Sequence, residues 1–319
     1  GPLPPETSLR EGGMKNKHVG MLMGGHNAEH EVSMKTGAAL SKALEKRGYR
    51  VTEIVVDTDL PRVLGAEGIE IAFVALHGRW GEDGCIQGLL ESMRIPYTGS
   101  GVLSSALSMN KVVAKSVFKH GGLRVVDDVV IEKSRLDEFS ATDLSLDFPV
   151  VVKPSCEGSS VGVSIVRSET EFNSALSRVG EYAGDILIER YVAGREIQVG
   201  VLADEAMGAI EIRPAEEFYD YKAKYQSGGT TQYLFPAPLS EEQTRDVCKL
   251  GLDAHKALGC RGVSRVDTIL GEDGNFYLLE VNTIPGMTEA SLIPKIARGI
   301  GISFEDLAER LLLGAALKA

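Results

Sequence analysis

Long apolar runs, paired cysteines and basic clusters are all missing from this 319-residue sequence. No apolar stretch approaches the ~20 residues that a membrane-spanning helix requires, so we expect no membrane partner. The four cysteines, at positions 85, 156, 248 and 260, form no C-x-x-C pair. This spacing disfavours a zinc ribbon or a disulfide framework and fits a reducing cytosol. The net charge of -11 and the absence of a Lys/Arg run argue against a nucleic-acid partner.

The composition is otherwise that of a soluble globular protein, with 43% hydrophobic and 25% charged residues. The length is enough for two or three domains, each with a core of its own. Gly1–Lys17 has no periodicity, and its Gly-Pro start is typical of a protease-cleavage scar. We therefore expect residues 1–17 to be a tag or a disordered N-terminus without a secretory signal, and Met14 to be a candidate native start.

The first third of the chain alternates between predicted strands and helices. The strands are His18–Gly25, Val51–Val56 and Ile69–Leu76, and a segment of helical spacing lies between the first two. Such alternation predicts a parallel sheet covered by helices. Because ligands of such sheets bind beyond the carboxyl ends of the strands, the loops Gly24–His30 and His77–Gly84 are candidate binding segments.

Glu29 and His77 are the candidate functional side chains of these loops. Glu29 lies near a helix start, where it either complements the helix dipole or holds a substrate ammonium group. His77 ends a strand, where a histidine is more often a hydrogen-bonded structural residue than a catalyst. The three glycines between positions 78 and 84 indicate backbone that approaches a ligand closely. Zinc is disfavoured, because Met34 stands where the second histidine of an H-E-x-x-H motif would follow His30-Glu31.

The middle of the chain predicts a strand–loop–strand unit. Phe148–Lys153 and Val161–Val166 are predicted strands, and Ser155–Ser160 is the flexible loop between them. The loop is not a Walker A motif, because it has no G-K-[ST] and no helix follows it. Its small residues can still form an anion-binding nest. Lys153 then either supplies charge to a phosphate or lies on the surface.

Two glutamates follow in the next part of the predicted sheet. Glu189 lies on the predicted strand Asp185–Tyr191, and Gly200–Ile212 continues the sheet after Glu196. Both carboxylates either accept hydrogen bonds from an amino group or a sugar, or are solvated.

Residues 214–238 combine aromatic side chains with two lysines and a Gly-Gly pair. Long loops inside compact domains are usually functional, and this composition predicts a lid that closes over a phosphate-bearing ligand. The alternative is a disordered surface loop, which would leave many aromatic rings poorly solvated. Predicted helices at Leu239–Leu258 and Ile302–Leu317 complete the chain.

Val263–Leu270 and Asn275–Val281 predict a β-hairpin around Gly271–Gly274. A two-residue turn at Asp273-Gly274 would determine which residues face each other. The facing pairs would be Leu270 with Tyr277, Asp267 with Glu280, and Arg265 with Asn282. The side-chain period of two then places the last four of these residues on one face.

Two carboxylates that face each other across a hairpin repel and destabilise it. A bound divalent cation would offset the repulsion. Asp267, Glu280 and the amide oxygen of Asn282 are hard ligands that suit magnesium. The alternative is a solvated acidic face with Arg265 as the partner, and a one-residue bulge would break the register.

Seven motifs occur in one order along the chain. They are GG-x-x-AE-x-EVS at 24–33, HGRWGEDG-x-x-QG at 77–88, YTGSG at 97–101, VKPSCEGSSVG at 152–162, FYDY-x-AKY at 218–225, GC-x-G-x-x-R-x-D at 259–267 and LLE-x-NT-x-PGMT at 278–288. Together, from about His18 to the C-terminus, they resemble the D-alanine–D-alanine ligases of the ATP-grasp superfamily. The resemblance implies an α/β fold that is α+β in its ATP-binding part. An N-terminal parallel-sheet domain at 18–110 would bind substrate, and two domains at 111–195 and 196–319 would clamp ATP, with the lid loop at 214–238.

The resemblance also implies a nucleotide and metal site. Asp267, Glu280 and Asn282 would bind two Mg²⁺ (or Mn²⁺) ions that bridge the ATP phosphates. The other implied ATP-binding residues are Lys111, Lys153 and Lys224 at the phosphates, Glu189 at the adenine amino group, Glu196 at the ribose, Phe218 on the adenine ring, and Ser159, Ser160 and Leu279 in the same site.

The implied reaction joins two D-alanines through a D-alanyl phosphate and releases ADP and phosphate. Glu29 would hold the ammonium group of the first D-alanine, with Ser159 and Tyr225 connecting it to the lid. His77 would lie near the carboxylate of the same substrate.

For the second step the resemblance implies stabilisation of a tetrahedral oxyanion by Arg265 and the Gly286 N–H. Ser291 and Leu292 would lie near the carboxylate of the second D-alanine. In this family a tyrosine at the position of Tyr225 accompanies D-alanine as second substrate, which disfavours a ligase that uses D-lactate or D-serine.

The alternative hypothesis outside the enzymes is a catalytically inactive nucleotide-binding scaffold. It predicts the loss of a metal ligand or of Arg265, and none is lost. The resemblance further implies a homodimer in the bacterial cytoplasm with a role in peptidoglycan precursor synthesis.

Overall fold

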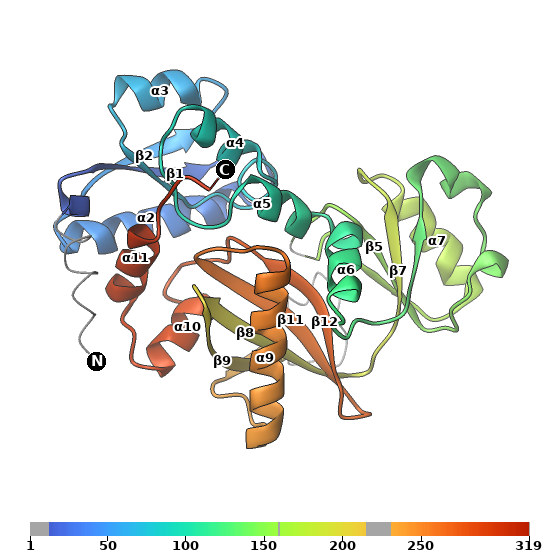
Figure 1. Cartoon of the computed structure of the whole chain (residues 1–319). Coiled ribbons are helices and arrows are strands. Elements are labelled where there is room, and N and C mark those ends of the chain that lie inside the picture. Colours follow the sequence, from blue (N-terminus) through green and yellow to red (C-terminus); the bar gives the residue numbers. More distant parts are fainter. Residues whose placement is uncertain (1–12, 159, 215–230, 319) are drawn as a thin grey trace.

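The computed structural model describes residues 13–158, 160–214 and 231–318 and contains three separate sheets (Figure 1). The first is parallel, with the strand order β2-β1-β3. Its strands are β1 (His18–Gly24), β2 (Arg50–Val56) and β3 (Ile71–Val74), and its helices are α2 (His30–Lys46), α3 (Leu60–Ala66) and α4 (Cys85–Ser92). The predicted parallel sheet with covering helices is therefore confirmed.

The central strand β1 is buried on both faces, as expected for a parallel sheet covered by helices. Met21 and Met23 of β1 pack toward α2 and the C-terminal helices, whereas Leu22 packs toward α3 and α4. The loops that carry Glu29 and His77 follow β1 and β3, so both lie at the carboxyl edge of the sheet.

The second sheet is antiparallel, with the order β4-β7-β5-β6. Its elements are β4 (Asp128–Ile131), β5 (Val150–Pro154), β6 (Ser164–Val166), α7 (Glu169–Val179) and β7 (Ile186–Arg190), with short 3₁₀ turns at Lys133–Glu138 and Ala141–Asp143. Phe172 of α7 is fully buried against Val150, Val152 and Ile188 of the sheet.

The third sheet is antiparallel and has the order β10-β9-β8-β11-β12. Its strands are β8 (Gly194–Leu202), β9 (Glu205–Arg213), β10 (Gln232–Leu234), β11 (Val263–Gly271) and β12 (Phe276–Asn282). The remaining helices are α5 (Val102–Met109), α6 (Lys111–His120), α9 (Glu241–Ala257), α10 (Leu292–Gly299) and α11 (Phe304–Leu313). The predicted strand Gly200–Ile212 is thus two strands, and β10 lies inside the stretch expected to be a lid loop.

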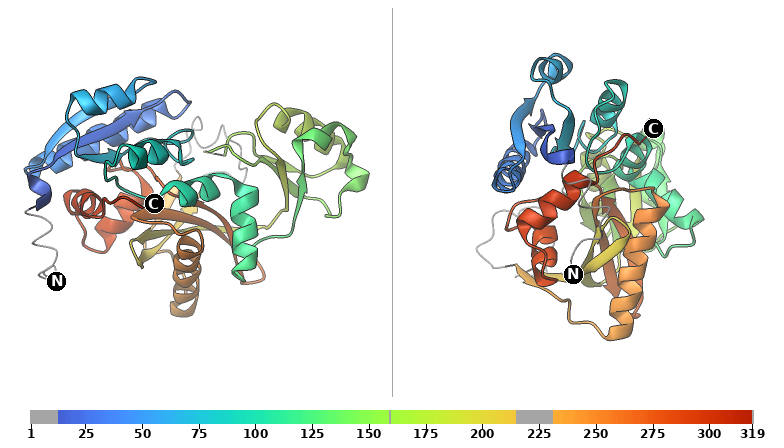
Figure 2. Two further views of the ribbon diagram at one scale, coloured as in Figure 1. Left: turned by 45° about the horizontal axis from the view of Figure 1, so that its top comes forward. Right: turned by 60° about the vertical axis from the view of Figure 1, so that its left-hand side comes forward.

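Opposite faces of the third sheet have different partners. Ile197, Val199 and Val266 pack with Val247 and Ala254 of α9, which covers one face. On the other face, α10 packs against β8 and β9 through Ile293 and Ile296, and β11 and β12 carry charged residues. The second sheet lies beyond α6 from the third sheet (Figure 2). Alternation along the strands, with apolar residues on the α9 side, therefore leaves a polar face for a ligand.

The predicted hairpin forms, but its turn differs from the expectation. Gly274 donates to the Gly271 carbonyl at 2.9 Å, and Gly271 donates to the Asn275 carbonyl at 2.9 Å. The loop therefore has three residues, with Gly274 in the left-handed region at φ +79°. Leu270 faces Phe276, so the predicted Leu270–Tyr277 pair is wrong.

A β-bulge then restores the register where it matters for function. The pairing shifts between Asp267 and Thr268, which face Glu280 and Leu278, so Leu279 is the extra residue of β12. Beyond the bulge the predicted pairs Asp267–Glu280 and Arg265–Asn282 are confirmed. The longer turn and the bulge each add one residue to the count, and the two changes cancel at Asp267.

Helix α11 packs against the first sheet and its helix α2. Arg47 binds Glu309 at 3.0 Å, the Tyr49 hydroxyl donates to the same carboxylate at 2.8 Å, and Lys46 binds Glu305 at 2.9 Å. The predicted final helix is thus confirmed as α11, while the sequence reasoning did not predict α10. Within the described residues, none of the helices has the length and apolarity that crossing a membrane demands.

Candidate active site

Asp267 and Glu280 lie side by side on the polar face of the third sheet and have separate cationic partners. Arg265 binds both oxygens of Asp267, from Nε at 2.8 Å and from a terminal nitrogen at 3.0 Å. Lys111 Nζ lies 3.3 Å from Glu280 Oε2. The two cations offset the repulsion that the sequence predicts between the carboxylates.

The charges around this pair keep both kinds of group ionised. Burial alone would raise the pKa of Glu280, but Lys111, Arg265 and Lys153 lower it to about 2. Burial alone would lower the pKa of Arg265, but Asp267 and Glu280 raise it. The site therefore holds full charges of both signs in a partly buried position.

Within the described residues no three His, Cys, Asp or Glu side chains gather into a metal-holding group. The donors present are the Asp267 and Glu280 carboxylates and the amide oxygen of Asn282, which also accepts from the Ile284 N–H at 3.0 Å. All are hard oxygen ligands on neighbouring strands, and they fit a divalent cation of the magnesium type.

A second ionic cluster surrounds Glu189 on β7. Lys153 binds Glu189 Oε2, and Lys115 binds Glu189 Oε1 at 2.6 Å. Lys115 also lies 3.3 Å from Asp128. Burial would raise the pKa of Glu189, yet Lys153 and Lys115 hold it below its usual range. Glu189 is thus an ionised, buried acceptor shared by two lysines.

The sequence reasoning did not single out Lys115, which comes from α6 and is only 3% exposed. Its spacing from Lys111 was a usable signal, because residues four apart share one face of a helix. The cap at Asn110 starts this helix by accepting from the N–H groups of Val112 and Val113 at 3.1 and 3.2 Å. The first helical turns therefore direct both lysines toward the sheets.

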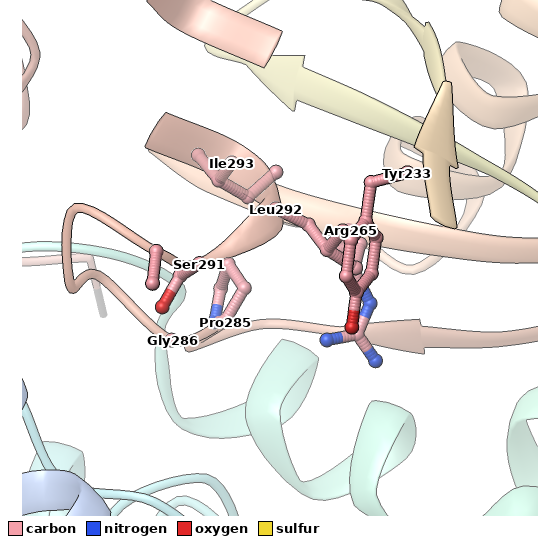
Figure 3. Close-up of a pocket in the computed structure, with 8 residues that line it drawn as sticks. Tyr233, Arg265, Pro285, Gly286, Ser291, Leu292 and Ile293 are labelled. Carbon is pink, nitrogen blue, oxygen red and sulfur yellow. The ribbon is translucent and has the colours of Figure 1, made fainter. Parts of the chain in front are cut away.

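A cavity of about 190 Å³ opens beside Arg265. Its walls include Tyr233, Gly286, Ser291 and Leu292, as Figure 3 shows. Ser291 precedes α10, and its hydroxyl accepts from the Thr288 N–H at 3.0 Å. Arg265, Gly286, Ser291 and Leu292, the four residues that the resemblance implies for the second step, thus line one cavity.

His77 and Glu29 meet at the carboxyl edge of the first sheet. His77 is buried, with Nδ1 2.9 Å from the Ile284 carbonyl and Nε2 3.2 Å from the Thr36 hydroxyl. Burial lowers the pKa of His77. Both ring nitrogens are therefore used inside the protein, in the hydrogen-bonded structural role that the sequence left open, and contact with a substrate stays a prediction.

The Glu29 carboxylate lies close to two glycines, Gly78 in the loop after β3 and Gly158 in the loop between β5 and β6. A Cβ at Gly78 would come within 2.7 Å of Glu29 Oε2, and one at Gly158 within 3.3 Å. These approaches bring the first-sheet loop to the Ser155–Ser160 loop, and they explain why small residues are required in both.

Glu82 is a further residue that the sequence reasoning missed. Its carboxylate accepts from the Gly78 N–H at 2.6 Å. Burial and the neighbouring Glu29 carboxylate raise the pKa of Glu82 to about 8. Only the tertiary structure brings the two acids together, so no local pattern could have revealed this.

Several predicted site residues remain. Ser159, Phe218, Lys224 and Tyr225 lie outside the described residues. Ser160 is exposed with φ +60°, and Leu279 is the bulge residue of β12. Glu196 lies on β8 and accepts from the Gln198 amide at 2.9 Å.

Two antiparallel sheets that face each other across buried lysines, carboxylates and an arginine define an ATP-grasp ligase, the class that joins a carboxylate to an amine with ATP. Family models described as D-ala D-ala ligase N-terminus and C-terminus match residues 63–100 and 117–313. The chain belongs to the D-alanine–D-alanine ligase family.

Individual relatives agree with this assignment. A D-alanine–D-alanine ligase of Geotalea uraniireducens is 55% identical over 96% of this chain and 97% of its own length. The enzyme of Anaeromyxobacter dehalogenans is 53% identical over 95% of this chain and 98% of its own. The crystal structure of the Bacillus anthracis ligase complexed with ATP superposes with a TM-score of 0.82, at 34% identity over 93% of this chain and 97% of that chain.

Proposed function

We propose that this chain ligates two D-alanines into D-alanyl-D-alanine, with ATP converted to ADP and phosphate. The observation that carries the proposal is the cavity beside Arg265, which adjoins the Asp267–Glu280 pair and is lined by Gly286, Ser291 and Leu292. Two further observations support the same conclusion. The chain belongs to a family of ligases, and its site holds carboxylates beside a lysine and an arginine.

ATP would bind between the second and third sheets. Lys111 and Lys153 would contact its phosphates, which requires both lysines to exchange their present carboxylate partners for phosphate oxygens. Glu189 would accept from the adenine amino group and Glu196 from the ribose. Phe218, Lys224, Ser159, Ser160 and Leu279 complete the proposed nucleotide-binding set.

Asp267, Glu280 and Asn282 would hold magnesium or manganese. When bound, the ions would supply positive charge that neutralises the transferring phosphoryl group. The depressed pKa of Glu280 supports this assignment, because an ionised carboxylate binds a metal without first losing a proton.

In the first step the carboxylate of one D-alanine would attack the γ-phosphorus of ATP, the bond to the β,γ-bridging oxygen would break, and an acyl phosphate and ADP would form. Glu29 would hold the ammonium group of this D-alanine, connected through Ser159 and Tyr225 to the lid. His77 would act on the same substrate by positioning, since its ring bridges Thr36 and the Ile284 carbonyl.

In the second step the amine of the other D-alanine attacks the acyl carbon and phosphate leaves. Arg265 and the Gly286 N–H would stabilise the oxyanion that develops. Asp267 holds the guanidinium of Arg265 in one orientation, so the donor is organised before the substrate arrives. Ser291 and Leu292 would position the second carboxylate.

ADP release from the purified protein, with and without D-alanine, tests the proposal. We expect D-alanine-dependent ADP release in the presence of ATP and Mg²⁺, together with D-alanyl-D-alanine detected by mass spectrometry. ATP binding without dipeptide would reject the substrate assignment, and D-lactate, D-serine and L-amino acids would then be tried. We further propose that the protein acts as a homodimer in the bacterial cytoplasm and serves peptidoglycan precursor synthesis.

A further inference from the structure

Gln198 lies in the middle of the polar face of the third sheet. On β8 it faces Asp267 of β11, which in turn faces Glu280 of β12, and Glu196 precedes it by two residues on the same face. On its other side Gln198 faces Ile210 of β9, which is fully buried. Gln198 therefore connects the proposed ribose-binding glutamate with the proposed metal-binding row.

Half of the Gln198 amide is hydrogen-bonded and half is not. Its Nε2 donates to Glu196 Oε1 at 2.9 Å. Its Oε1 is buried and has no hydrogen-bond partner in the part of the chain that the structure describes. The residue as a whole is only 3% exposed, so bulk water does not reach it freely. An unsatisfied buried carbonyl is unfavourable, because it has left water without a replacement donor.

The orientation of the amide is determined by chemistry. A carboxylate only accepts, so the amide nitrogen must face Glu196 and the oxygen must point away from it. Its cross-strand neighbours are Asp267, a carboxylate, and the apolar Ile210, and neither side chain can donate. No donor among the described residues reaches this oxygen, and a bound ligand can supply one.

We propose that Gln198 is a nucleotide-positioning residue whose Oε1 accepts a hydrogen bond from an O–H group of bound magnesium–ATP, while its Nε2 orients Glu196. The inference rests on the proposed function, because it assumes that ATP occupies this face. Two sources carry the required O–H group: a ribose hydroxyl on the Glu196 side and a metal-bound water on the Asp267 side. In either case binding of the nucleotide completes the hydrogen bonding of a buried amide.

The test is direct binding by isothermal titration calorimetry without D-alanine, using ATP, 2′-deoxy-ATP and 3′-deoxy-ATP, each with Mg²⁺ and with EDTA. Gln198→Met removes both amide groups at similar side-chain length, and Gln198→Asn keeps an amide but withdraws it by one methylene. We expect each variant to bind magnesium–ATP about tenfold more weakly than the unaltered chain.

The nucleotide series separates the two sources of the O–H group. If a ribose hydroxyl is the donor, the unaltered chain binds one deoxy nucleotide about tenfold more weakly than ATP, and Gln198→Met no longer distinguishes that pair. If a metal-bound water is the donor, the unaltered chain and Gln198→Met show the same ratios of affinity for ATP, 2′-deoxy-ATP and 3′-deoxy-ATP. The difference in ATP affinity between them then disappears in EDTA.

Thr268→Val is the matched control. Thr268 is fully buried in the same sheet, and its hydroxyl donates to the Ile197 carbonyl at 2.7 Å on the α9 side. This variant loses a buried hydrogen bond without altering the polar face, so its affinity for ATP should not change. Its thermal unfolding midpoint shows how much of any effect reflects a weakened sheet.

Equal affinities of the Gln198 variants and the unaltered chain for all three nucleotides, with and without Mg²⁺, would overturn the inference. Should Gln198→Met fail to fold, the Gln198→Asn variant carries the same comparison. ATP binding is measured without D-alanine, so it is independent of the ligation test. A chain that needs Gln198 for ATP but makes no dipeptide would retain this inference and lose the proposed function.

Discussion

Arg265 donates to both carboxylate oxygens of Asp267, the residue two positions further along the same strand. The two side chains therefore lie on one face of β11, and the guanidinium is held in a single orientation beside the cavity that Ser291 and Gly286 line. A planar, bidentate arrangement of this kind is available to arginine and not to lysine. It supports the proposed role of Arg265 as a preorganised donor for developing negative charge.

Replacement of Arg265 by methionine should lower the turnover number by about 10²–10³-fold, the usual loss for an oxyanion donor. ATP affinity should change little, because the proposed role of Arg265 belongs to the second step, after the phosphoryl group has left ATP. Steady-state kinetics and calorimetry separate the two quantities. Arg213→Met is the control, since Arg213 also binds a carboxylate on this sheet, that of Glu211, and should leave turnover unaffected. Equal losses in both variants would contradict the assigned role.

Glu280→Gln should raise the Mg²⁺ concentration needed for half-maximal activity by about tenfold or more, because it replaces an ionised ligand with a neutral one. Chelation of the metal should abolish dipeptide formation by the unaltered protein. The measurement is activity against Mg²⁺ concentration. Asp273→Asn changes an exposed acid at the tip of the same hairpin, where it accepts from Tyr277, and should leave the Mg²⁺ requirement unchanged.

Lys115→Met should lower the free energy of unfolding by about 3–5 kcal/mol, because it removes one partner of a buried ionic cluster. Glu189 would keep Lys153 but lose its 2.6 Å contact with Lys115. Denaturant unfolding provides the measurement. Lys119→Met is the matched control one turn further along α6. Lys119 binds Asp128 with a side chain that is 49% exposed, so its loss should cost less than about 1 kcal/mol.

Two results would contradict this account of Lys115. One is an equal effect of the Lys115 and Lys119 substitutions. The other is the absence of any weakening of ATP binding in Lys115→Met, since a Glu189 that has lost one cation should compete more strongly with phosphate for Lys153. Lys115→Arg retains the charge and should recover part of both losses.

Glu82 should make folding stability depend on pH in the direction opposite to an ordinary salt-bridged acid. Its pKa rises from the usual 4.5 to about 8 in the folded chain, through burial and the nearby Glu29 carboxylate. Between these pH values the folded protein holds a proton that the unfolded chain has released. The contribution of Glu82 to stability is therefore present below about pH 4.5 and declines as the pH rises toward about 8.

Glu82→Gln mimics the protonated side chain and removes this dependence. Relative to the unaltered protein, the variant should gain stability between pH 5 and pH 8, by on the order of 1 kcal/mol or more. Urea unfolding of both proteins at several pH values provides the comparison. A difference in unfolding free energy that stays constant with pH would show that Glu82 ionises normally.

The parallel first sheet, the antiparallel second unit and the polar face of the final hairpin could all be predicted from the sequence. Each depends on local periodicity: continuous apolar runs for buried strands, glycine-rich loops between them, and a period of two that groups Arg265 with Asp267. The seven motifs added the family and, through it, the proposed roles of residues such as Lys153, because the spacing within a motif is a property of the linear sequence.

The hairpin itself shows where local reasoning stops. The predicted pair Asp267–Glu280 is present, although the turn has three residues and β12 carries a bulge at Leu279. A turn length and a bulge each shift the register by one residue, and packing of the apolar face against α9 selects the combination in which both shifts cancel. The sequence alone allowed either outcome.

By itself, then, the sequence determined the order and type of most elements and which face of β11 and β12 is polar, since these follow from side-chain alternation. Only the tertiary structure decided the ionic partners. Lys115 meets Glu189 across 74 positions, and Glu82 comes under the influence of Glu29 across two loops. Such contacts depend on how separate sheets and helices pack, and charges buried together by packing leave no periodic trace in the chain.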